Sequence, residues 1–130
     1  MQMNDSSHDA LILAAVEARK KAYASYSNFA VGAALLTTDG KIFVGCNVEN
    51  VSYGLTMCAE RVAIGNAVAQ GCQSFETITI ATEHAVSPCG ACLQVLAEFC
   101  EQLNILLTDE DGHNVRKITL QAMLPDRFAG

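Results

Sequence analysis

The segment Thr77–Thr108, TITIATEHAVSPCGACLQVLAEFCEQLNILLT, passes through three hydrophobic patterns in turn. Residues 77–82 alternate in polarity as a strand does, and residues 104–108 form a short apolar run of strand length. Between them a helix is expected to begin at Cys89. Three large apolar residues along that helix share one face: Leu96, Phe99 and Leu103. A strand, a helix and a strand in this order predict a right-handed parallel crossover.

The residues upstream of this crossover predict a helix and a hairpin. Ser6-Ser7-His8-Asp9 has the pattern of a helix start with Ser6 as the cap, and the helix is expected to end near the basic run Arg19-Lys20-Lys21. Two apolar runs, 30–36 and 42–48, flank the turn residues 38–41. These runs predict a pair of antiparallel strands.

A second helix and a last strand complete the pattern. The helix is expected from Cys58 to about Gln70, where Gly71 ends it, and its small and apolar residues on all sides predict that it is buried. Residues 115–120 predict a strand. The expected fold class is therefore α/β: a single-domain, three-layer α-β-α sandwich with a central mixed sheet, spanning residues 1–130.

Composition and charge narrow the classes of function. Of the 130 residues, 51% are hydrophobic and 17% are charged, whereas about 25% charged residues is typical. This small polar share hints at an oligomer, although a compact alanine-rich monomer is equally compatible with it. The formal charge is −6, and the dense basic cluster at residues 19–21 suits a helix C-terminus. We therefore expect no nucleic-acid partner.

The sequence also bears on location. Met1–Asp5 lacks a basic region followed by an apolar run, so no signal peptide is expected, and no apolar stretch reaches membrane-spanning length. We therefore expect no membrane partner and a cytoplasmic protein. In that reducing compartment the six cysteines are expected to serve as thiols and metal ligands rather than disulfides.

Two motifs, Cys58-Ala59-Glu60-Arg61 and Pro88-Cys89-Gly90-Ala91-Cys92, carry the chemistry. Cys89 and Cys92 are three residues apart on one helix face, and Cys58 opens the other helix. Helix N-termini favour thiolates. Three thiolates can hold zinc and leave a fourth position open, as in a hydrolytic site. The alternative is a structural zinc site, in which a fourth protein ligand would come from Cys46, Cys72, Cys100, His84 or His113. Structural zinc sites usually take their ligands as two pairs close in sequence, and this sequence has no second pair.

Glu60 and Arg61 are the candidates for assisting that metal. Glu60 is two residues after the candidate ligand Cys58, on a helix that is expected to be buried. A buried carboxylate is costly unless it is paired or has a catalytic role. Glu60 could accept and transfer the proton of a metal-activated water. The alternative is a capping carboxylate. Arg61 shares a helix face with Cys58 and could hydrogen-bond its thiolate. The alternative is an ordinary surface arginine.

Beyond these motifs, the sequence resembles the zinc-dependent deaminases, and within them the small homotetrameric cytidine deaminases of nucleoside salvage. The resemblance extends from about Ala10 to the C-terminus. It rests on CAE followed by PCxxC, and on four longer segments: FAVGAA (29–34), NVEN (47–50), TMCAER (56–61) and LPDRF (124–128).

This resemblance implies a role for each matching residue. Cys58, Cys89 and Cys92 would bind one zinc ion per chain, and Glu60 would shuttle protons. Asn47 and Glu49 would bind the ribose hydroxyl, for which turn chemistry after a strand is the alternative. The remaining implied contacts are Phe29 against the nucleoside, the Ala59 backbone on the base, and Tyr53 and Phe128 at subunit contacts near the pocket. A core position for Phe29 and a frayed tail at Phe128 are the alternatives.

The implied activity is hydrolytic deamination of cytidine and deoxycytidine to uridine and deoxyuridine, with release of ammonia, by zinc-activated water and a glutamate proton shuttle. Deamination of another cytosine-bearing small molecule and a non-catalytic zinc module remain as alternatives. A polynucleotide editor is disfavoured by the acidic charge. The family usually has arginine after the second cysteine of PCxxC, where this chain has Leu93. That departure affects any charge balance or subunit contact which the arginine would supply.

Overall fold

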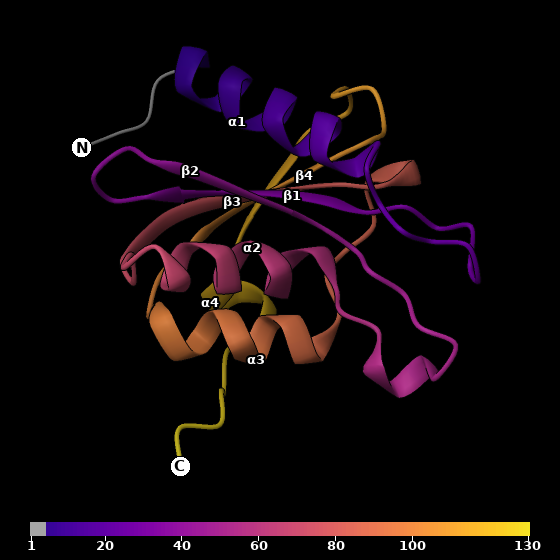
Figure 1. Cartoon of the computed structure of the whole chain (residues 1–130). Helices are drawn as coiled ribbons and strands as arrows, with labels where there is room; N and C mark the ends of the chain where they lie inside the picture. Colours follow the sequence, from indigo (N-terminus) through magenta and orange to yellow (C-terminus); the bar gives the residue numbers. More distant parts are fainter. Residues whose placement is uncertain (1–4) are drawn as a thin grey trace.

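The computed structural model describes residues 5–130 as a mixed five-stranded sheet between two layers of helices (Figure 1). The signal-peptide prediction falls partly on residues 1–4, outside the described residues, and the predicted Ser6 cap falls on a side chain that is also outside them. The elements are α1 (Asp5–Arg19), β1 (Gly32–Thr37), β2 (Ile42–Cys46), α2 (Ala59–Ala69), β3 (Phe75–Ala81), α3 (Gly90–Phe99), β4 (Asn104–Thr108), β5 (Arg116–Thr119) and α4 (Leu120–Met123), with short 3₁₀ turns at Tyr53–Leu55 and Glu83–Ala85.

The sheet has the strand order β2-β1-β3-β4-β5. β1 pairs antiparallel with both β2 and β3, whereas β3 pairs parallel with β4, and β5 closes the other edge antiparallel to β4. The predicted hairpin and the predicted parallel crossover are therefore both confirmed, as is the α/β class. In Figure 1, α1 lies over one face of the sheet, and α2 and α3 lie side by side over the other.

Two hydrophobic cores fill the spaces between the layers. β1 contributes to both, because Ala33 and Leu35 point into the core under α2 and α3, while Ala34 and Leu36 point into the core under α1. Successive side chains of a strand alternate between the faces of a sheet. A strand buried on both faces therefore needs an unbroken apolar run, which explains why the AVGAALL segment lacks alternation.

Two predictions about the helices were wrong. α3 ends at Phe99 because Cys100 adopts an extended backbone (φ −135°, ψ 127°), so Leu103 lies outside the helix and enters the core on the approach to β4. α2 is buried on one side only, with Ala63 and Ala67 against the sheet and Val68 exposed. Among residues 5–130, no further layer covers the outer face of α2.

The ends of the predicted strands also differ from the structure. The chain forms β5 only over Arg116–Thr119 and then turns into α4, where the Thr119 hydroxyl accepts a hydrogen bond from the backbone N–H of Ala122 at 3.2 Å. The hydroxyl therefore caps a short helix that the strand-like pattern had concealed. β2 ends at Cys46, two residues before the predicted end.

Within the described residues, no helix combines the length and the apolar character needed to cross a membrane.

Candidate metal centre and active site

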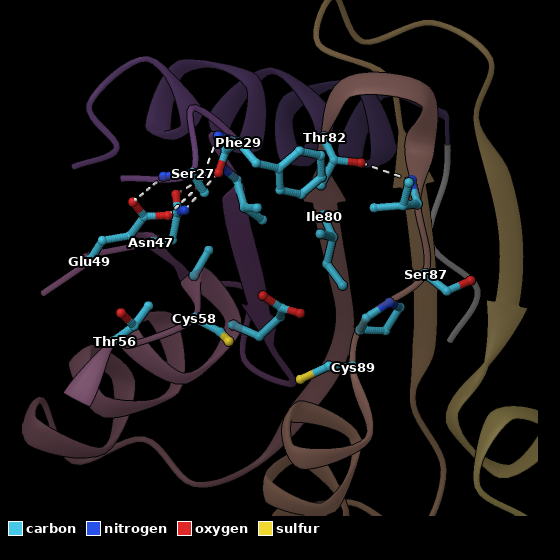
Figure 2. Close-up of a pocket in the computed structure, with 15 residues that line it drawn as sticks. Ser27, Phe29, Asn47, Glu49, Thr56, Cys58, Ile80, Thr82, Ser87 and Cys89 are labelled. Atoms are coloured by element: carbon cyan, nitrogen blue, oxygen red, sulfur yellow. Dashed lines mark hydrogen bonds between the residues drawn. The ribbon is translucent and has the colours of Figure 1, made fainter. Parts of the chain in front are cut away.

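The three motif cysteines meet where two helices begin. Cys58 is the N-cap of α2 and Cys89 is the N-cap of α3, both with extended backbones and neither with a side-chain capping bond. Cys92 lies in the first turn of α3 and is fully buried. The three sulfur atoms lie within 4.8 Å of one another. In Figure 2 the sulfur atoms of Cys58 and Cys89 point toward the same space between the two helices.

The thiol cluster stabilises negative charge on Cys58. The pKa of Cys58 is lowered to about 5, first because Cys92 donates a hydrogen bond to it and then through the hydrogen bond and charge of Arg61. The pKa of Cys92 is raised, mainly because its proton is held in that hydrogen bond, with burial adding to the effect. Cys89 and Cys92 are also in contact, with 3.5 Å between their sulfur atoms.

This donor set fits zinc. Soft thiolates are preferred zinc ligands, and three of them in a compact triangle leave a fourth coordination position. Within the described residues, none of the proposed fourth ligands joins the cluster. His84 is 84% exposed and lies instead 3.5 Å from Glu83. The remaining candidates likewise lie outside the group: Cys46, Cys72, Cys100 and His113.

Glu60 and Arg61 follow Cys58 on α2 and face different surroundings. The Glu60 side chain is 4% exposed, and burial is the main cause that raises its pKa, with the charge of Cys58 adding to it. Arg61 Nη2 donates a hydrogen bond to Cys58 Sγ at 3.2 Å. The arginine thus balances charge on a metal-ligand candidate, while the carboxylate is held in an apolar place beside it.

A cavity of about 270 Å³ opens over the cysteines and Glu60. Cys58 and Cys89 lie at one end of its lining, away from Phe29 (Figure 2). Glu60 and Glu49 belong to the same lining. The residues that line it are Ser27, Phe29, Val31, Asn47, Glu49, Thr56, Cys58, Ala59, Glu60, Ile80, Thr82, Val86, Ser87, Pro88 and Cys89. This lining contains no lysine, arginine or histidine.

Asn47 and Glu49 hold the cavity wall formed by the segment before β1. Asn47 Nδ2 donates to the carbonyl of Phe29 at 2.8 Å, and its Oδ1 accepts from the N–H of Val31 at 2.9 Å. Glu49 Oε1 accepts from the backbone N–H groups of Tyr26 and Ser27, each at 3.0 Å. Figure 2 shows the contacts of Asn47 with Phe29 and of Glu49 with Ser27 at one side of the pocket. The two residues therefore orient Phe29 in addition to lining the cavity themselves.

Tyr53 and Phe128 lie outside the lining of this cavity. Tyr53 is 73% exposed, and its ring packs edge-on against Tyr26 with 6.0 Å between centroids. Phe128 is 75% exposed, and its carbonyl accepts a hydrogen bond from Gln94 Nε2 at 3.0 Å. Leu93, where the family usually has arginine, is buried in the core under α2 and α3.

Sequence reasoning assigned no role to several residues of the lining, among them Ser27 and Thr82, whose hydroxyl groups make hydrogen bonds. Ser27 contacts Glu49 and Phe29 through its hydroxyl, and Thr82 Oγ1 accepts the backbone N–H of Val86 at 2.8 Å. Ser27 lies in the polar stretch 25–28, and this stretch predicted only an interruption between the first helix and the first strand. Thr82 lies at the end of a predicted strand, where a buried hydroxyl beside a loop is a weak signal of loop anchoring.

Comparisons with known proteins agree with this site. The sequence model for the "Cytidine and deoxycytidylate deaminase zinc-binding region" matches residues 5–107. A cytidine deaminase of Sporosarcina psychrophila is 47% identical over 122 residues, covering 92% of this chain and 89% of the relative. The blasticidin-S deaminase of Bacillus cereus is 31% identical over 109 residues, covering 75% and 76% of the two chains.

The crystal structure of a cytidine deaminase from Burkholderia pseudomallei superposes with a TM-score of 0.88 at 52% identity, covering 93% of this chain and 98% of that one. The likeness therefore extends over nearly the whole of both chains. With its three-cysteine cluster at two helix starts, the chain belongs to the zinc-binding family of cytidine and deoxycytidylate deaminases.

Proposed function

We propose that this protein hydrolyses the exocyclic amine of cytidine and deoxycytidine, releasing ammonia and leaving uridine and deoxyuridine. The observation that carries the proposal is one cavity lined at the same time by metal-ligand candidates, by the buried carboxylate of Glu60, and by polar groups suited to a sugar. The relatives named cytidine deaminase support the same reaction and a role in pyrimidine nucleoside salvage.

Cys58, Cys89 and Cys92 would hold one zinc ion in each chain. Zinc in such a site supplies a Lewis acid that lowers the pKa of a bound water toward about 7. Arg61 would offset part of the negative charge of three thiolates through its hydrogen bond to Cys58 Sγ at 3.2 Å.

Glu60 would act as the general base and then as the general acid. Its carboxylate takes a proton from the attacking water and delivers it to the ring nitrogen as the water oxygen bonds to C4 of cytosine. The second proton of the water goes by the same carboxylate to the departing amine, so that ammonia leaves and the C4 carbonyl forms. Burial supports this role, because a side chain that is 4% exposed is shielded from exchange with bulk water.

The rest of the lining would bind the nucleoside. Asn47 and Glu49 would bind a ribose hydroxyl, Phe29 would contact the nucleoside, and the backbone of Ala59 would hydrogen-bond the base. The absence of a cationic residue from this lining, together with the presence of two carboxylates, disfavours a 5′-phosphate. This supports a free nucleoside over a nucleotide or a nucleic acid.

We further propose that residues 1–130 form a single catalytic domain that assembles as a cytoplasmic homotetramer. Exposed apolar surface supports assembly: Val68 on α2, Val44 on the edge strand β2, Tyr53 and Phe128 are all at least 36% exposed in the single chain. Tyr53 and Phe128 would then lie near the pocket of a neighbouring subunit. Light scattering tests the assembly, and a monomer at working concentration would contradict it.

The activity is tested by following the ultraviolet absorbance of cytidine with purified protein of measured zinc content, with and without a chelator. Zinc-dependent conversion to uridine is the expected result. A protein holding one zinc per chain that leaves cytidine and deoxycytidine unchanged would overturn the proposal. Blasticidin S belongs in the same substrate panel, because one relative is named for that activity.

A further inference from the structure

We propose that Ser27 is a positioning residue for sugar recognition, which orients the Glu49 carboxylate and ties it to the Phe29 segment of the cavity wall. This inference rests on the proposed function, because it concerns how the nucleoside is bound. Ser27 lines the same cavity as Glu49 and Phe29, and it lies outside the motifs CAER and PCGAC.

The Ser27 hydroxyl joins two residues of the cavity lining. Its Oγ donates a hydrogen bond to Glu49 Oε2 and accepts one from the backbone N–H of Phe29 at 2.9 Å. A hydroxyl has a single proton to donate, and here that proton is committed to the carboxylate. The hydroxyl therefore has no proton left to donate to a substrate, and its two contacts within the lining are Glu49 and Phe29.

The acceptor sites of Glu49 can be counted. An ionised carboxylate offers about four lone-pair sites, two on each oxygen. Oε1 uses two of them on the N–H groups of Tyr26 and Ser27, and Oε2 uses one on the Ser27 hydroxyl. One site on Oε2 remains for a sugar hydroxyl, in an orientation that the other three bonds fix.

These bonds also keep the carboxylate ionised. The hydrogen bond from the Ser27 hydroxyl is the largest cause that lowers the pKa of Glu49, and the two backbone N–H groups contribute in the same direction. An ionised and oriented acceptor binds a hydroxyl more strongly than a freely rotating one. Loss of the Ser27 hydroxyl would therefore weaken binding through the sugar while leaving the metal cluster and Glu60 in place.

The test combines Ser27→Ala with removal of the sugar hydroxyls from the substrate. We expect kcat/KM for cytidine to fall about tenfold, which corresponds to loss of one charge-assisted contact. For 2′,3′-dideoxycytidine, which has no hydroxyl for Glu49 to accept, kcat/KM should change by less than about twofold. The inhibition constants of uridine and 2′,3′-dideoxyuridine, measured for Ser27→Ala and for the unmodified protein, provide the same comparison without turnover.

Two further variants sharpen the test. Ser27→Thr keeps the hydroxyl and should restore most of the lost kcat/KM. Ser25→Ala is the matched control, because Ser25 is exposed in the same segment and its side chain makes no hydrogen bond within the described residues. It should behave as the unmodified protein does.

The outcomes separate the possible failures. Equal losses for cytidine and dideoxycytidine in Ser27→Ala, or no loss for cytidine, would overturn the positioning role. If the unmodified zinc-loaded protein leaves cytidine unchanged, the proposed function itself fails. A loss confined to substrates with sugar hydroxyls, with rescue by Ser27→Thr, supports the inference.

Discussion

Gly45 of β2 lies directly against Ala59, the first residue of α2. A β-carbon placed on Gly45 would come within 2.4 Å of the carbonyl oxygen of Ala59 and 2.5 Å of the backbone nitrogen of Ala63. Both neighbours are backbone atoms of a helix, so neither can move aside as a side chain would. This contact fixes the distance between the sheet and the helix that begins at Cys58 and carries Glu60.

Gly45→Ala is therefore expected to push α2 away from the sheet. The free energy of unfolding should fall by roughly 1–3 kcal/mol, and zinc retention should fall with it, because Cys58 moves with the helix. Urea unfolding and metal analysis measure the two effects. Gly65→Ala is the control, since a β-carbon there meets open space and alanine favours a helix. Equal stability of the two variants would contradict the close-packing argument.

Glu60→Gln is expected to separate chemistry from metal binding. The amide keeps the size of the side chain but cannot accept and return a proton at this site, so kcat should fall by roughly 10²–10⁴. Zinc content and the unfolding midpoint should stay close to those of the unmodified protein. Retention of full activity would remove Glu60 from the mechanism.

Arg61→Gln is expected to loosen the metal. The variant removes the donor that lies 3.2 Å from Cys58 Sγ, and loss of such outer contacts typically weakens metal affinity by about 10–100-fold. Competition with a chromophoric chelator measures the change. Lys20→Gln, which removes an exposed cation paired with Glu17, should leave zinc affinity unchanged. Identical affinities of the two variants would assign Arg61 to the surface role.

Thr82→Val is expected to loosen the loop that precedes Cys89. Thr82 is 2% exposed, and its Oγ1 accepts the Val86 N–H at 2.8 Å, so an isosteric methyl leaves that N–H without its partner. The cost should be about 1–3 kcal/mol in urea unfolding, and KM for cytidine should rise because Val86 lines the cavity. The free energy of unfolding of Thr82→Ser, which keeps the hydroxyl, should lie between those of Thr82→Val and the unmodified protein. A Thr82→Val protein with unchanged stability would contradict this anchoring.

Asp109 is expected to give the turn after β4 a pH-dependent stability. Backbone N–H donation from His113 is the main cause that lowers the pKa of Asp109 below its ordinary 3.8. Its stabilising contribution is therefore complete above pH 3.8 and is lost as the pH falls through the lower pKa of the folded protein. Asp109→Ala should be less stable than the unmodified protein at pH 7, and this gap should narrow below pH 3.8.

Thermal unfolding of Asp109→Ala across this pH range measures the gap. Asp111→Ala provides the control, because the Asp111 carboxylate is exposed and makes no hydrogen bond within the described residues. A gap for Asp109→Ala that stays constant with pH would contradict the assignment.

The sequence predicted the α/β class and the metal cluster because their signals are local. CAER and PCGAC each stand at a helix start, and the alternation of strand and helix around residues 77–108 requires a sheet with a crossover. The contacts of Ser27 with Glu49 depend instead on how two segments 22 residues apart align across the edge of the cavity. No periodicity reports such an alignment.

The burial of α2 was overestimated for a related reason. Its composition is apolar all round, but composition does not say whether the second covering layer belongs to the same chain. The end of α3 at Phe99 was missed because Leu103 continues the helical spacing, while the extended backbone of Cys100 breaks the helix without glycine or proline. Roles of the substrate-contacting residues stay predictions, since they depend on a bound nucleoside.

The central position of β3 has a consequence for the order in which the protein acquires its chemistry during synthesis. The β1–β2 hairpin and α2 can form from contacts close in sequence, and this part of the chain already includes Glu60 and Cys58, the N-cap of α2. The parallel pairing of β3 with β4 must wait for the whole crossover, which includes Cys89 and Cys92. Closing a long connection is the slow step in building such a sheet. A nascent or stalled chain can therefore contain every ligand residue and still lack the site, so activity appears only after the last long-range pairing has formed.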